Sequence, residues 1–150
     1  MNRSPEELAA ACAESMYRND RASKLLGMEI ERVGPGEAHM VMTVKEDMLN
    51  GHDVCHGGFI FSLADSSFAF ACNSQNFNTL AAGARVEFLA PGKLGDVLRA
   101  SATVVSQGRR AGVYDVVVTN QHGKTIALFR GNSQRIGGHL VEPVEGEEHE

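Results

Sequence analysis

One apolar segment constrains the fold of this chain more than any other feature. Residues 57–75 read GGFIFSLADSSFAFACNSQ, and small and apolar residues surround a single carboxylate, Asp65. A helix with this composition is apolar on almost every side, so it has to be buried with other elements packed around it. Burying a carboxylate costs free energy unless the group is paired or used. Asp65 therefore needs either a partner or a chemical role.

The overall composition is typical of one globular domain. The chain has 150 residues, of which 43% are hydrophobic, and this is enough to bury one core. We expect a single domain over residues 1–140. The tail at 141–150, which reads VEPVEGEEHE, is acidic and poor in apolar side chains, so we expect it to be disordered.

The charge and the distribution of apolar residues exclude several classes of protein. No apolar run reaches the roughly 18 residues that would cross a bilayer, and the first residues do not form a basic and then apolar leader. The three cysteines form no regular framework, and the net charge of -5 argues against general nucleic-acid binding. We therefore expect a cytoplasmic protein that binds neither membranes nor nucleic acids.

Periodicity and turn residues predict two helices and two strands before the apolar segment and four strands after it. Ser4 and Pro5 are typical of a helix N-terminus. The expected helices before the apolar segment span 5–19 and 22–26. The expected strands span 28–33, 37–44, 81–89, 96–106, 112–119 and 124–134. Short, glycine-containing breaks between the last strands predict an antiparallel meander.

This order of elements predicts an α+β protein in which one antiparallel sheet wraps around a long central helix. The concave face of the sheet would bury the helix, and the helix would fill the apolar side of the sheet. The outer face and the two edge strands would still need covering, so we expect the chain to pair with a second copy.

The start of the central helix is a candidate site for an oxyanion. His56, Gly57 and Gly58 lie where a loop enters the helix, and the first N–H groups of a helix have no partner within it. Asp65 follows eight residues after Gly57, about 12 Å along a helix. Because proton transfer requires contact at ~3 Å, Gly57 and Asp65 could act on one substrate only if they came from different subunits.

These residues also carry a resemblance to a known family. Asn50-Gly51-His52, then Cys55-His56-Gly57-Gly58, then Asp65 after six residues, strongly resemble the PaaI-type hotdog-fold thioesterases associated with phenylacetate degradation. The resemblance continues through 68–75, 88–92, 112–115 and 127–131. It covers most of the chain outside the acidic tail.

The resemblance implies a hotdog fold and the hydrolysis of acyl-CoA thioesters. We expect aryl- or arylacetyl-CoA as the substrate, with the free acid and CoA as products. The resemblance also implies a dimer whose two sheets join edge to edge, and a dimer of such dimers. The N–H of Gly57 would polarise the thioester carbonyl, and Asp65 of the other subunit would act as general base or nucleophile. Asn50 would help to hold the water or the carbonyl, and His56 would support the loop and could contact the carbonyl. No cofactor is implied, because CoA is part of the substrate.

The phosphates of CoA need cationic side chains. Arg109 and Arg110, in a turn between two expected strands, are the first candidates, and Lys93 is the second. Gly58 would let the substrate approach the backbone closely.

The same residues allow other interpretations. His52, Asp53, Cys55 and His56 carry metal-binding groups, but zinc usually takes ligands from separated segments, so no metal site is predicted. A Cys55 nucleophile is chemically reasonable, yet packing under the loop is the simpler role. A dehydratase acting on acyl thioesters and a non-catalytic acyl-CoA sensor remain open as functions.

Asp65 itself has a purely structural interpretation. Backbone groups and the hydroxyls of Ser62 or Ser66 could satisfy the buried carboxylate without any catalytic role.

Overall fold

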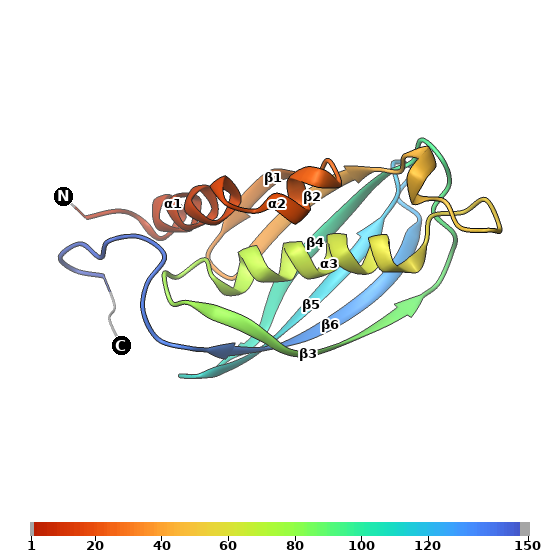
Figure 1. Cartoon of the computed structure of the whole chain (residues 1–150). Helices are drawn as coiled ribbons and strands as arrows, with labels where there is room; N and C mark the ends of the chain where they lie inside the picture. The colour runs from red at the N-terminus through yellow and green to blue at the C-terminus, as the bar shows by residue number, and fades with distance from the viewer. Residues whose placement is uncertain (1, 148–150) are drawn as a thin grey trace.

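A six-stranded antiparallel sheet curves around one helix in the computed structural model, which describes residues 2–147 (Figure 1). The helices are α1 (Pro5–Arg18), α2 (Arg21–Leu25) and α3 (Gly57–Cys72), with a 3-10 turn η1 (Glu46–Met48). The strands are β1 (Glu29–Gly34), β2 (Glu37–Thr43), β3 (Thr79–Phe88), β4 (Val97–Gln107), β5 (Ala111–Thr119) and β6 (Thr125–Arg135). This is the α+β hotdog architecture that the sequence predicts.

The predicted elements are confirmed, with ends that differ by one or two residues. The strand order is β1-β2-β4-β5-β6-β3. The predicted meander holds for β4, β5 and β6, whereas β3 pairs with β6 at the far edge. The connection from β3 to β4 therefore leads from an edge of the sheet past the positions of β6 and β5, and β3 is an edge strand.

Helix α3 packs along the concave face of the sheet, as its composition predicts. Phe68 is fully buried against Tyr114 and Phe129, with ring centroids 5.7 and 5.8 Å away. The hydroxyl of Ser67 donates to the carbonyl oxygens of Ala38 in β2 and Ala100 in β4, at 2.8 and 3.1 Å. These contacts fix both the rotation of α3 and its position along the sheet.

Helix α1 forms for the reason that the sequence suggests. The side chain of Ser4 accepts the N–H of Glu7, and Glu7 in return accepts the N–H of Ser4, which is a capping box. The helix contacts β1 and α3 beside the sheet. Among residues 2–147, no helix is both long and apolar enough to span a membrane.

Part of the acidic tail contacts the domain. Asn76, just after α3, accepts the N–H groups of Leu140 and Val141 at 2.9 Å, and Arg3 forms an ion pair with Glu147 at 2.8 Å. Residues 148–150 lie outside the described residues, so disorder in the tail stays a prediction for them.

Substitution of Gly131 tests the packing of α3 on β6. An added methyl carbon would lie 2.7 Å from Cε2 of the buried Phe68 ring, which has no room to move. We expect Gly131→Ala to lower the free energy of unfolding by about 1–3 kcal/mol, measured by urea denaturation. Gly51→Ala is the control, since nothing lies within 4 Å of its added carbon. Equal stability of the two variants would contradict the packing described.

Candidate active site

The N-terminus of α3 presents one backbone donor without an acceptor. His56 is the N-cap, and its Nδ1 accepts the N–H of Gly58 at 2.9 Å, while Phe59 donates to the His56 carbonyl oxygen at 3.0 Å. In the described part of the chain, no acceptor bonds the N–H of Gly57. His56 therefore satisfies the second amide of the helix and leaves the first one open to a ligand.

The loop before α3 is held by its own backbone and by Asn50. The side-chain oxygen of Asn50 accepts the N–H of His52 at 2.9 Å and that of Val54 at 3.4 Å. The Nδ2 group of Asn50 donates to none of residues 2–147, so it remains available to a substrate or water. Cys55 ties the loop to the sheet connection by donating its N–H to the Gly92 carbonyl oxygen at 2.8 Å.

Asp65 is half-buried and has no hydrogen-bond partner among the described residues. Burial raises the pKa of its carboxyl above the ordinary aspartate value. The Ser62 hydroxyl donates to the Gly58 carbonyl oxygen at 2.8 Å, and the Ser66 hydroxyl lies 3.0 Å from that of Ser23. Because both hydroxyls are engaged elsewhere, the purely structural interpretation of Asp65 has no support.

The predicted site residues fall into three places within one protomer. Asn50, His56, Gly57 and Gly58 lie together at the start of α3. Asp65 is the ninth residue of the same helix, about 12 Å further along. One protomer therefore does not bring Asp65 to Gly57.

The predicted cations lie at opposite ends of the molecule. Lys93 follows Gly92, whose carbonyl oxygen binds Cys55, so it lies near the start of α3. Arg109 and Arg110 are exposed in the β4–β5 turn, and their carbonyl oxygens accept N–H groups of Arg135. Arg135 also donates to Gln75, just after the end of the 16-residue helix α3, so the two arginines lie roughly 24 Å from Gly57.

An apolar groove of about 500 Å³ opens beside Gly57. It is lined by Val54, Cys55, Gly57, Ile60, Phe88, Leu89, Ala90 and Pro91. Residues 88–92 are part of the resemblance, but the sequence predicts no role for Phe88. A large apolar residue near the end of a predicted strand was the available signal.

The Cys55 thiol does not fit the role of a nucleophile. The residue is buried, and burial raises the pKa of its thiol to about 11, so the reactive thiolate is scarce at neutral pH. Within residues 2–147, no cluster of three or more His, Cys, Asp or Glu side chains is arranged to hold a metal ion.

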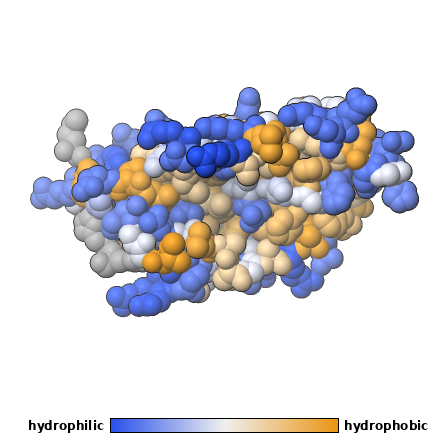
Figure 2. Space-filling model, in the orientation of Figure 1, coloured by the Kyte–Doolittle hydropathy of each residue, from blue (hydrophilic) through white to orange (hydrophobic). Residues whose placement is uncertain are grey.

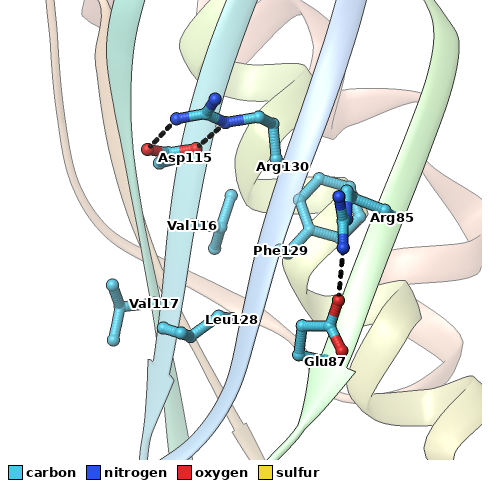
Figure 3. Close-up of a pocket in the computed structure, with 8 residues that line it drawn as sticks. All are labelled: Arg85, Glu87, Asp115, Val116, Val117, Leu128, Phe129 and Arg130. Atoms are coloured by element: carbon cyan, nitrogen blue, oxygen red, sulfur yellow. Dashed lines mark hydrogen bonds and ion pairs between the residues drawn. The ribbon is translucent and has the colours of Figure 1, made fainter.

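A second hollow, on the outer face of the sheet, lacks the features of a reactive site. It measures about 310 Å³ and lies over β3, β5 and β6 (Figure 3). Arg130 pairs with Asp115 at 2.6 Å, and Arg85 pairs with Glu87 at 2.7 Å. Since these four charged groups are already paired, the hollow offers no free acid or base.

Comparison with known proteins agrees with this geometry. The sequence profile described as "Thioesterase superfamily" matches residues 52–127. The acyl-coenzyme A thioesterase PaaI of Escherichia coli K12 is 52% identical over 129 residues, covering 86% of this chain and 92% of that protein. The chain belongs to the thioesterase superfamily. Within that superfamily it is a PaaI-type hotdog acyl-CoA thioesterase.

Solved structures support the same assignment. The E. coli PaaI protein from the phenylacetic acid degradation operon superposes with a TM-score of 0.90 at 50% identity, covering 91% of this chain and 99% of that one. A hypothetical thioesterase from Streptococcus pneumoniae TIGR4, solved with coenzyme A, gives 0.73 at 29% identity, covering 75% and 91%. The predicted family, fold and enzyme class are thus confirmed, and the dehydratase and sensor alternatives lose their support.

The buried carboxylate predicts a pH-dependent difference in stability. Because the folded-state pKa of Asp65 is raised, its ionisation destabilises the fold as pH rises above the ordinary aspartate range near pH 4. We expect Asp65→Asn to melt at a higher temperature than the wild type at neutral pH. The gain should shrink as pH falls below that range, in thermal scans across pH.

Asp47→Asn provides the matched control, because Asp47 is exposed on η1. It should leave the melting temperature nearly unchanged at each pH. A loss of stability in Asp65→Asn at neutral pH would instead reveal a stabilising partner for the carboxylate.

Proposed function

We propose that the protein hydrolyses aryl- and arylacetyl-CoA thioesters at two equivalent sites shared between the subunits of a homodimer. The observation that carries the proposal is the separation of the two reactive groups. Within residues 2–147, the N–H at Gly57 and the partly desolvated carboxylate at Asp65 have no hydrogen-bond partner, and they lie about 12 Å apart on one helix. A second copy of the chain supplies the missing group to each site.

The chemistry follows from what each group can do. The thioester carbonyl oxygen accepts the N–H of Gly57, which stabilises the negative charge that develops during attack. The partner subunit's Asp65 takes a proton from the attacking water, or itself attacks the carbonyl carbon to form a mixed anhydride that water then hydrolyses to the free acid. The C–S bond then breaks, and CoA leaves as the thiolate and is protonated. The Asn50 amide group holds the water or carbonyl, and His56 keeps the helix start in place.

The uncovered face of α3 supports pairing with a second copy. Gly58, Ser62, Asp65 and Ala69 recur at helical spacing along the side that the sheet does not cover, and they are exposed or half-buried. Their small side chains allow close approach of another helix. Figure 2 shows a band of hydrophobic residues on the face that carries α3 and β3. The exposed edge strand β3 offers unpaired backbone groups for edge-to-edge joining of two sheets.

The same arrangement accounts for the distant arginines. If two α3 helices run antiparallel with each Asp65 facing the other subunit's Gly57, the end of one helix extends beyond the start of the other. Arg109 and Arg110, at the far end of one subunit, then come near the partner's Gly57 together with the partner's Lys93. Their guanidinium groups suit the CoA phosphates. Two such dimers would form the dimer of dimers that the resemblance implies.

Asparagine at position 65 tests the role of the carboxylate. Asp65→Asn keeps the shape of the side chain but can neither accept the proton nor attack the carbonyl. We expect thiol release from phenylacetyl-CoA to fall by about 10²–10⁴-fold, measured with a thiol reagent. Asp47→Asn, the same substitution at an exposed site, should retain wild-type rates. Undiminished thiol release by Asp65→Asn would rule out the mechanism.

Mixing two inactive variants tests whether the sites are shared. Gly57→Pro removes the N–H and adds a Cβ and ring carbons, at a helix position that tolerates proline, and should lower the rate by about 10²–10³-fold. Gly57→Ala is its control, because it adds the Cβ but keeps the N–H. After subunit exchange with Asp65→Asn, mixed dimers regain one complete site. At equal amounts, about a quarter of wild-type activity should return, since half of the dimers are mixed.

Subunit exchange has to be demonstrated independently, for example by mass spectrometry of differently tagged chains. If mixed dimers form and no activity returns, both groups act within one chain or not at all.

A further inference from the structure

We propose that Phe88 determines the acyl specificity of the enzyme by forming an aromatic wall against which a planar aryl group packs beside the Gly57 amide. This inference rests on the proposed function and deepens it, because it assigns the choice of acyl group to one residue of the site.

The ring of Phe88 lies directly over the first residue of α3. A Cβ on Gly57 would lie 2.9 Å from Cζ and 3.2 Å from Cε1 of the Phe88 ring, so only glycine leaves room for the ring there. Phe88 is nevertheless 53% exposed. The ring tip thus touches the residue that polarises the carbonyl, while much of the side chain remains free to contact a ligand.

The backbone around Phe88 is held firmly. Phe88 pairs with Ala127 at the end of β3. The N–H groups of Leu89 and Ala90 both donate to the Ile126 carbonyl oxygen, at 2.8 and 3.2 Å. A wall on such a backbone keeps its position relative to Gly57, which specificity requires.

The chemistry of the groove suits an apolar acyl group. Its lining residues carry no carboxylate, ammonium or guanidinium group, and the Cys55 thiol is neutral at physiological pH because burial raises its pKa to about 11. The groove therefore offers nothing to the CoA phosphates. When the thioester carbonyl oxygen accepts the Gly57 N–H, the acyl carbon lies next to the Phe88 ring. An arylacetyl group would contact the ring there.

The comparison of two substrates isolates the contribution of the ring. Phenylacetyl-CoA and cyclohexylacetyl-CoA share the same carbon skeleton and differ in the planarity and π-system of the six-membered ring. Aromatic pairs gain stabilisation beyond buried area, which corresponds to a preference of about three- to tenfold. We expect this preference in kcat/KM for the wild type and for Phe88→Tyr. Phe88→Leu keeps an apolar side chain but should lose the preference for phenylacetyl-CoA.

Leu94→Ala is the control, because it removes another exposed apolar side chain that does not line the groove. Its substrate ratio should equal that of the wild type. A Phe88→Leu variant that keeps the wild-type ratio overturns the inference, even if it hydrolyses both substrates more slowly. If the wild type releases no thiol from phenylacetyl-CoA, the proposed function itself fails. If it releases thiol but Phe88→Leu keeps the wild-type substrate ratio, only the inference on Phe88 fails.

Discussion

The packing of α3 against the concave face of the sheet is the interaction on which the rest of the structure depends. Phe68 fills the space under β5 and β6, and the Ser67 hydroxyl ties the helix to β2 and β4. These contacts cover one side of α3 and determine which residues face away from the sheet. They thereby hold Asp65 in a partly desolvated position on the uncovered side, where its carboxyl forms no hydrogen bond with any other described residue.

The start of the same helix has to keep a backbone donor available while the segment stays ordered. His56 satisfies the Gly58 amide, and the Asn50 side chain stabilises the preceding loop, so the Gly57 N–H remains open without leaving the segment disordered. A rigid helix cannot bend Asp65 back over two turns to reach that amide. This geometric limit is the physical reason for proposing a dimer as the catalytic unit, and it makes the uncovered face of α3 functional.

Most of the secondary structure could be predicted from the sequence, because local signals agreed with the fold. The capping box at Ser4 and Glu7, the turn glycines and the apolar composition of α3 each pointed to the element that forms. The position of β3 beside β6 could not be predicted, since short connections favour neighbouring strands. The Phe88 ring over Gly57 was also missed, because that contact joins residues far apart in the chain.

The sequence by itself determined the family, the central helix and the identity of its single carboxylate, because these depend on composition and spacing along the chain. Only the tertiary structure decided that Ser62 and Ser66 are engaged elsewhere and leave Asp65 without a hydrogen bond to the described part of the chain. It also placed Arg109 and Arg110 at the opposite end of α3 from Gly57. Hydrogen-bond partners and burial depend on elements that meet only when the sheet closes around the helix.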